Sequence, residues 1–458
     1  MIRPTVSTRV VAFALIALLA VLTSPLAPAA VPPSAAPFAS QSAQPVAFPG
    51  AMGWAAHTPG GRGGRILRVT TLAAEGPGSF ADAIEAKGPR IVVFEVGGVI
   101  DLGVKTLRIR EPYLTIAGQT APQPGITLIR GGLDIATHDV VVRHLRIRPG
   151  EAGQPKRAGE DFDAISTVSG AYDVIVDHCS LTWATDENLS ASGTRFGGAN
   201  ATEWRDTTSH RITFSNNLIA EGLANATHRK GEHSKGSLIH DNARDILIVR
   251  NLYAHNNERN PLFKGGTEGV VVNNLIYNPG QRAVHYNLIP AEWDGHRYED
   301  GRLTLIGNAM RGGPNTPQES AFFMYGGSGG LDLYMRDNLA VDRIGRTLPQ
   351  QGRYSTSPGG VRMLGKAPPL PFGVVPIPSR DVQDAVIADV GARPWDRDDI
   401  DRRILADTIE GRGKVIDSEQ EVGGYPLQPE TRQAFVEADW NLDTMEPRKP
   451  LPRREPLR

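Results

Sequence analysis

The middle of this 458-residue chain repeats a short run of β-branched and aliphatic residues that tends to end in Asn. Residues 247–251 (LIVRN) and 270–274 (VVVNN) are two examples, and similar runs recur every 23 to 38 residues. The aligned end positions are Leu145, Cys179, Asn217, Asn251, Asn274, Asn308 and Asn338. The spacers are rich in Gly, Asn and Asp and show no amphipathic helical pattern, which argues against a βαβ fold and favours a solenoid of stacked strands.

The repeats predict an all-β fold, a parallel β-helix in which each repeat forms one coil. Five of the seven end positions are Asn, a residue that tolerates the left-handed backbone conformation needed at a corner. Asn side chains that stack from coil to coil can also hydrogen-bond to one another. A β-sandwich with Asn at its turns by chance is the alternative.

The first 30 residues have the pattern of a secretory signal peptide. Arg3 and Arg9 form a basic start, residues 10–22 are uncharged, and small residues at 27–30 offer a cleavage site. A retained membrane anchor is the alternative, but the apolar run is shorter than the roughly 20 residues that span a bilayer. We therefore predict export, to the extracellular space or the periplasm, with no membrane association after cleavage.

Three further segments follow the predicted signal peptide. Residues 31–47 are rich in Pro, Ala, Ser and Gln and are expected to form a flexible linker. We expect the β-helix catalytic domain to span residues 48–378, and residues 379–458 to form a helical or irregular segment that packs on the solenoid. Helical spacing is visible at 381–390, 395–406 and 430–439, and the basic tail from Arg448 is predicted to be disordered.

Charge and cysteine content exclude several function classes. The formal net charge is −1, which argues against binding nucleic acid through bulk positive charge. The single cysteine excludes an intrachain disulfide, a Cys-rich zinc site and a paired redox motif. We expect a monomer whose stability comes from a long hydrogen-bonded core.

An acidic cluster is the first candidate site. Asp161 and Asp163 share one face of an extended segment, and Asp186 and Glu187 follow about one coil later. Stacked coils lie about 4.8 Å apart, so these carboxylates can converge on one ion. Carboxylates without nearby His or Cys suit a hard cation, most plausibly calcium, whereas turn residues that bond their own backbone are an equal alternative.

Two basic clusters come one and two coils later. The first spans residues 228–236 (HRKGEHSKG) and the second residues 259–264 (RNPLFK). Each alone is typical of a solvated loop. Together with the acidic cluster, on loops of a rigid scaffold, they predict a site for a polyanionic ligand whose carboxylates a metal and cations would neutralise.

Residues from about 48 to 340 resemble the pectate lyases of polysaccharide lyase family 1. The matching stretches, specific as an ordered series, are 47–51 (AFPGA), 60–64 (GGRGG), 76–80 (GPGSF), 115–122 (TIAGQTAP), 161–165 (DFDAI), 174–179 (VIVDHC) and Arg259-x-Pro261. The resemblance implies a right-handed parallel β-helix and calcium-dependent cleavage of an acidic polysaccharide, polygalacturonate, by β-elimination.

The resemblance also implies a calcium site. Asp163 matches the family's calcium-binding Asp, Asp161 matches the acid two residues before it, and Asp186 matches a further acidic ligand. The family has another Asp four residues after this position, where this chain has Ser190. Glu187 is expected to compensate for it.

The resemblance assigns the basic residues to catalysis and substrate binding. Lys235 resembles the family's lysine for the substrate carboxylate, and Arg259 matches the arginine that takes the C5 proton. Lys264 stands where the family has a second arginine, and a lysine cannot form the same bidentate fork. His178 is expected to be a structural hydrogen-bonding residue.

With the signal pattern, the resemblance implies a secreted calcium-dependent lyase for de-esterified pectin. We expect an alkaline optimum, because arginine is neutral only at high pH. Three alternatives stay open. A β-helix glycoside hydrolase would use paired carboxylates and work in a chelator. A non-catalytic polysaccharide-binding protein of the same fold would release no unsaturated product. A lyase for another uronate polymer would differ only in substrate.

Overall fold

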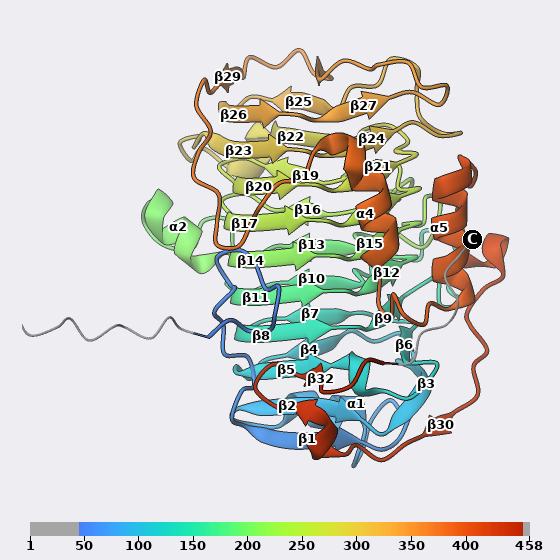
Figure 1. Cartoon of the computed structure of the whole chain (residues 1–458). Coiled ribbons are helices and arrows are strands. Elements are labelled where there is room, and N and C mark those ends of the chain that lie inside the picture. The colour runs from blue at the N-terminus through green and yellow to red at the C-terminus, as the bar shows by residue number, and fades with distance from the viewer. Residues whose placement is uncertain (1–44, 452–458) are drawn as a thin grey trace, which may run out of the picture. The chain divides into compact units, whose positions relative to one another are not determined.

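The computed structural model describes residues 45–451, which wind into a parallel β-helix (Figure 1). Each coil contributes one strand to each of three sheets, in the order first, second and third sheet. The predicted fold class is therefore confirmed. The predicted signal peptide, most of the predicted linker and the end of the basic tail lie outside the described residues.

The three sheets run the length of the solenoid. The first sheet contains β1 (Arg65–Val69), β2 (Arg90–Phe94), β5 (Leu114–Ala117), β8 (His138–Arg143), β11 (Tyr172–Asp177), β14 (His210–Ser215), β17 (Arg244–Val249), β20 (Glu268–Val272), β23 (Gly301–Ile306), β26 (Leu331–Arg336) and β29 (Val361–Met363). The second contains β30 (Thr431–Arg432), β3 (Val96–Asp101), β6 (Ile126–Ile129), β9 (Arg146–Arg148), β12 (Ser180–Thr182), β15 (Leu218–Ala220), β18 (Leu252–Ala254), β21 (Leu275–Tyr277), β24 (Ala309–Arg311) and β27 (Leu339–Val341). The third contains β4 (Leu107–Ile109), β7 (Leu133–Ile135), β10 (Ile165–Thr167), β13 (Leu189–Ala191), β16 (Leu238–Ile239), β19 (Leu262–Lys264), β22 (Val284–Leu288), β25 (Phe323–Gly327) and β28 (Gln351–Arg353).

Short helices and one small hairpin decorate this frame. The α-helices are α1 (Phe80–Glu85), α2 (Ala201–Thr207), α3 (Pro290–Trp293), α4 (Val382–Asp389) and α5 (Asp399–Glu410). The 3-10 turns are η1 (Gly118–Thr120), η2 (Ser379–Asp381), η3 (Glu419–Val422) and η4 (Glu437–Asp439), and β31 (Trp440–Asn441) pairs with β32 (Glu446–Pro447). Helices α2 and α3 lie in loops between strands, where the sequence showed no helical pattern; both are too short to display one.

Alternation along each strand fills the solenoid interior. In β11, Val174 and Val176 point inward, and they stack on Ile212 and Phe214 of β14 in the next coil. The same arrangement continues in both directions and forms one apolar core along the axis. Because parallel strands buried in this way pack side chains on pleated surfaces, the β-branched composition of the repeats follows from the fold.

A ladder of Asn side chains runs through the corner between the first and second sheets, as predicted. Asn251 accepts hydrogen bonds from the backbone N–H and the side-chain amide of Asn217 at 2.8 and 3.0 Å. Its own amide donates to Asn274 and to the carbonyl of Phe214, both at 2.9 Å. The ladder continues through Asn308 to Asn338 and satisfies buried backbone groups at every coil.

The left-handed residue at this corner is not the ladder Asn, which corrects our prediction. Positive φ occurs one position earlier, at His178 (50°), Asn216 (56°), Arg250 (57°) and Asn273 (54°). The ladder residue must keep an orientation in which its amide points inward to the next coil. The preceding residue therefore makes the turn, and its side chain contacts neighbouring groups outside the ladder: His178 bonds Asp177, and Asn273 donates to the carbonyls of Gly307 and Ile377.

The C-terminal segment packs along the flank of the solenoid and does not cover one end of it (Figure 1). Val382 and Val386 of α4 and Leu405 of α5 contact Leu218 and Leu252 on the outer face of the second sheet. The predicted helices at 381–390 and 395–406 correspond to α4 and to the first part of α5, which starts four residues later and extends further.

Buried ion pairs hold α5 on the second sheet. Arg148 is fully buried and donates to both oxygens of Asp398 at 2.7 and 3.2 Å and to Asp401 at 2.8 Å. Arg403 forms two hydrogen bonds with buried Glu221 at 2.6 and 2.8 Å. A buried charge is tolerated only when it is paired, so these contacts fix the register of the segment on the sheet.

The third predicted helix, at 430–439, is absent from the structure. Residues 431–432 form β30, which pairs antiparallel with Val96 and Gly97 of β3, and only a 3-10 turn follows. Phe435, Trp440 and Met445 cover Ile91 and Val93 of the first sheet. Tertiary pairing with a free strand edge therefore overrides the local helical pattern.

None of the helices in residues 45–451 combines the length and hydropathy needed to cross a bilayer.

We predict that Asn251→Ala lowers stability by about 2–4 kcal/mol, because it leaves several buried backbone groups without partners. The thermal unfolding midpoint measures the effect. Asn338→Ala is the matched control at the half-buried end of the ladder and is expected to cost clearly less. Equal losses in the two variants would show that the ladder does not carry this stability.

Candidate active site

The predicted site residues lie on the loops that lead from the second sheet into the third. Asp163 precedes β10, Glu187 precedes β13, Lys235 precedes β16 and Arg259 precedes β19. These four strands are successive neighbours in one parallel sheet, so the loops emerge along the same edge. Ile165 pairs with Leu189, and this register places Asp163 beside Glu187.

Three of the four predicted acidic ligands converge. Ligand oxygens of Asp163, Asp186 and Glu187 all lie within 4.8 Å of one another. Asp163 also accepts a hydrogen bond of 2.9 Å from the backbone N–H of Glu187. Burial, and then the charge of Asp186, raise the pKa of Asp163 well above its usual range. The group thus concentrates negative charge that a divalent cation would relieve.

Asp161 lies at the margin of this group. Its carboxylate is 3.7 Å from Nε2 of His228 and 3.7 Å from Nε of Arg229. The position that Ser190 occupies also contributes no charge. Ser190 is buried in β13, in register with Ser166 of β10, so Glu187 supplies the third carboxylate of the cluster.

Two histidines next to Asp186 were missed as site residues. His233 Nε2 lies 3.1 Å from Asp186, and His228 Nε2 lies 3.8 Å from its other oxygen. Burial alone would raise the pKa of Asp186, but the hydrogen bond and charge of His233 lower it. The sequence contained them only as part of a basic loop, and nothing in their spacing pointed to a carboxylate on another coil.

Each predicted substrate-binding cation is paired with a glutamate. Arg259 pairs with Glu187, Lys235 with Glu258, and Lys264 with Glu292 of α3. Glu258 and Glu292 were not predicted, and both come from coils later than the acidic cluster. The cations are therefore held in place before any ligand arrives, by carboxylates of the chain itself.

Burial lowers the pKa of two of these cations, Lys235 and Arg259. Burial, and then the charge of Arg282, lower the pKa of Lys235 to about 8. Burial also lowers the pKa of Arg259, although Asp186 and Asp163 oppose the shift. Arg259 has a positive φ of 62°, a conformation that costs a non-Gly residue roughly 1 kcal/mol or more and is enriched at functional sites.

Lys264 stands apart from the other predicted residues. It is the last residue of β19, whereas Arg259 precedes the first residue of that strand. Its side chain is buried and pairs with Glu292, and neither Glu292 nor its other acidic neighbour, Asp241, belongs to the acidic cluster. The structure thus brings together Asp163, Asp186, Lys235 and Arg259, with Glu187 between them, and leaves Lys264 at the far end of the strand.

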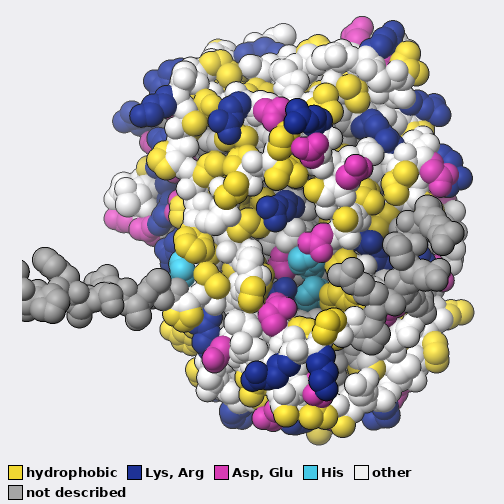
Figure 2. All heavy atoms as spheres, viewed as in Figure 1, with side chains coloured by type: hydrophobic (Ala, Val, Ile, Leu, Met, Phe, Trp, Pro, Cys, Tyr) yellow, Lys and Arg dark blue, Asp and Glu magenta, His cyan; other side chains and the backbone are white. Residues whose placement is uncertain are grey.

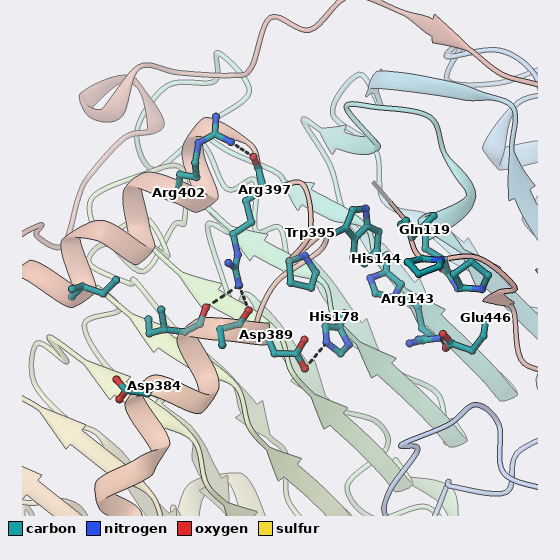
Figure 3. Close-up of a pocket in the computed structure, with 17 residues that line it drawn as sticks. Gln119, Arg143, His144, His178, Asp384, Asp389, Trp395, Arg397, Arg402 and Glu446 are labelled. Atoms are coloured by element: carbon teal, nitrogen blue, oxygen red, sulfur yellow. Dashed lines mark hydrogen bonds and ion pairs between the residues drawn. The ribbon is translucent and has the colours of Figure 1, made fainter. Parts of the chain in front are cut away.

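A cavity of about 770 Å³ lies elsewhere, between the corner of the first and second sheets and the C-terminal segment (Figure 3). Several charged residues in it and next to it pair with one another. His178 bonds Asp177 at 2.7 Å and Asp389 at 3.3 Å, and Arg143 bonds Asp177 at 3.0 Å and Glu446 at 2.8 Å. Figure 2 shows histidine, acidic and basic side chains gathered in a hollow beside α4. We interpret these groups as contacts that hold the C-terminal segment, in line with the structural role expected for His178.

A parallel β-helix with a row of carboxylates and paired cations along one sheet edge has the architecture of a polysaccharide lyase. No family model matches the chain. Curated relatives do match. The chain is 33% identical over 384 residues to "Probable pectate lyase C" of Aspergillus terreus, covering 83% of this chain and 81% of that protein. It is 31% identical over 384 residues to the protein of the same name from Emericella nidulans. The chain belongs to the pectate lyase family.

Solved structures show the same fold at low sequence identity. A pectate lyase studied for its substrate specificity and anti β-elimination mechanism superposes with a TM-score of 0.51 at 15% identity, covering 76% of this chain and 98% of that one. Jun a 1, the major allergen of cedar pollen, gives 0.50 at 17% identity, covering 74% and 92%. The shared feature is the β-helix.

We predict that the pH dependence of stability includes a contribution from His178. Burial alone would lower its pKa, but the charge and hydrogen bond of Asp177, helped by Asp389, raise it from 6.5 to about 9. The stabilisation is therefore complete below pH 6.5 and is lost as the pH rises through about 9. Thermal unfolding midpoints of the wild type should fall across this interval.

The matched variants are His178→Gln and His296→Gln, the latter at an exposed histidine. The midpoint of His178→Gln is expected to fall less between pH 6.5 and 9, since an amide does not titrate. Parallel slopes for all three proteins would contradict the assignment.

Proposed function

We propose that the chain is a secreted, calcium-dependent lyase that cleaves de-esterified pectin by β-elimination at C5 of the uronate. The observation that carries the proposal is the convergence of Asp163, Asp186 and Glu187 beside Arg259 and Lys235 on one sheet edge. The names of the relatives and a solved pectate lyase bound to a hexasaccharide support the substrate class.

The carboxylate cluster fits a calcium ion. Its members offer only oxygen atoms, which hard cations prefer, and they lie close enough to share one ion. Asp163, Asp186 and Glu187 would hold the ion, and Asp161, at the margin of the cluster, is the fourth residue assigned to it. Calcium bound there supplies Lewis-acid stabilisation of negative charge on the substrate carboxylate.

The basic residues bind the substrate and move its proton. Lys235 binds a uronate carboxylate, and Lys264 is assigned to the next carboxylate along the chain. Arg259 in its neutral form accepts the C5 proton, the released electron pair forms the C4=C5 double bond, and the C4–O bond breaks. The departing oxygen is protonated by solvent. Desolvation lowers the pKa of Arg259 against the opposing charges of Asp186 and Asp163, so the neutral form is reached at high pH, and an alkaline optimum follows.

Export follows from the signal pattern in residues 1–30, which precede the described residues. A polymer such as pectin cannot enter a cell intact, so a lyase for it has to meet it outside the cytoplasm. This agreement between the signal pattern and the substrate supports the extracellular or periplasmic location.

We predict that polygalacturonate with calcium yields an ultraviolet-absorbing unsaturated product, and that a chelator abolishes it. Arg259→Ala should lower kcat by about 10²–10⁴-fold, because a positioned proton acceptor contributes that much. Arg302→Ala removes an exposed arginine from the outer surface and is the matched control. Unchanged turnover of Arg259→Ala would refute the role of Arg259. Faster product formation on alginate or methylated pectin would refute the substrate.

A further inference from the structure

Glu187 has two competing partners. Its carboxylate belongs to the cluster with Asp163 and Asp186, and it also pairs with Nη1 of Arg259. The side chain of Glu187 is only 4% exposed, so water cannot substitute for either partner. One carboxylate therefore serves both the cation-binding cluster and the proposed proton acceptor.

The backbone of Glu187 is fixed, whereas its side chain can change partners. Its N–H donates to Asp163 at 2.9 Å, its carbonyl accepts from Ala164 at 3.0 Å, and the residue pairs with Lys235 on the next coil. Only the side-chain torsions are free to respond to a ligand. A small rotation decides whether the carboxylate faces the other acids or the guanidinium.

We infer that Glu187 is a positioning residue that exchanges Arg259 for the cation, so that cation binding frees Arg259 to face the substrate. This inference rests on the proposed function and adds a role for the cation beyond holding the uronate. Without the cation, Arg259 stays in an ion pair that directs it away from proton transfer. With Glu187 drawn to the cation, the guanidinium loses its partner as the C5 proton arrives.

Such competition is reciprocal. If the cation draws Glu187 away from Arg259, then Arg259 must weaken cation binding by the same factor. Arg259→Gln should therefore bind calcium more tightly than the wild type, although it lacks the proposed catalytic group. A residue that only accepts a proton would change metal affinity through its charge alone, and equally with and without the Glu187 carboxylate.

A double-mutant cycle tests the inference by calorimetric titration of calcium into the full-length protein without substrate. We expect Arg259→Gln to tighten binding about five- to tenfold, within the usual range of coupling between sites. Glu187→Gln should weaken binding. In the Glu187→Gln background, Arg259→Gln should tighten binding clearly less than in the wild type, because the contested carboxylate is gone and only the charge effect on Asp163 and Asp186 is left.

Loss of a positive charge also tightens cation binding through space, and Arg229→Gln controls for this. Arg229 is exposed, its Nε lies 3.7 Å from Asp161, and within residues 45–451 it forms no ion pair with Glu187. Its effect should be equal in both backgrounds. Arg259→Lys, which keeps the charge on a different head group, should give an intermediate affinity and serves if Arg259→Gln is unstable in thermal unfolding.

The outcomes separate the inference from the proposed function. Equal tightening by Arg259→Gln in both backgrounds, or none in either, overturns the exchange. If the cycle gives either of these results while calcium binds and the wild type makes unsaturated product, the proposed function stands and only the exchange is refuted. If calcium binds to none of the proteins, the exchange and the calcium requirement fall together.

Discussion

The stacking of one coil on the next is the constraint on which the rest of the structure depends. Parallel strands in the three sheets repeat at a fixed spacing of about 4.8 Å, and from Asn217 to Asn338 the Asn ladder joins successive coils at the same corner. With the register fixed, residues separated by more than twenty positions become neighbours. Asp163 and Glu187 meet in this way, and Lys235 follows on the next coil.

This regularity also determines how charge is arranged along the third sheet. The chain places acids and bases on successive coils, so each cation finds a carboxylate one or two coils away. Glu258 holds Lys235 on one side and Arg282 on the other. Internal anions thus hold the long basic side chains in place along this edge, and in the function proposed above the carboxylates of the substrate would replace them.

The sequence predicted the parts of the structure that repeat. The Asn endings located the corner ladder, and the clusters at Asp161–Glu187 and at 228–264 located the sheet edge. The sequence could not predict which acid would pair with which base. Glu292 reaches Lys264 from a four-residue helix, and His233 reaches Asp186 from a long loop, and neither geometry has a periodic signature. The prediction of a helix at 430–439 was wrong because residues 431–432 pair as a strand with Val96 and Gly97 of β3.

The pairing of β30 with β3 joins the last part of the chain to the first coils. A ribosome makes residues 96–97 long before residues 431–432, so this sheet edge stays open through most of synthesis. An open edge is a template for pairing with other chains, and covering it late protects the finished molecule. The C-terminal segment therefore covers this edge only once the whole chain has been made. A chain shortened before β30 would keep an unpaired strand edge and would be exposed to proteases and aggregation.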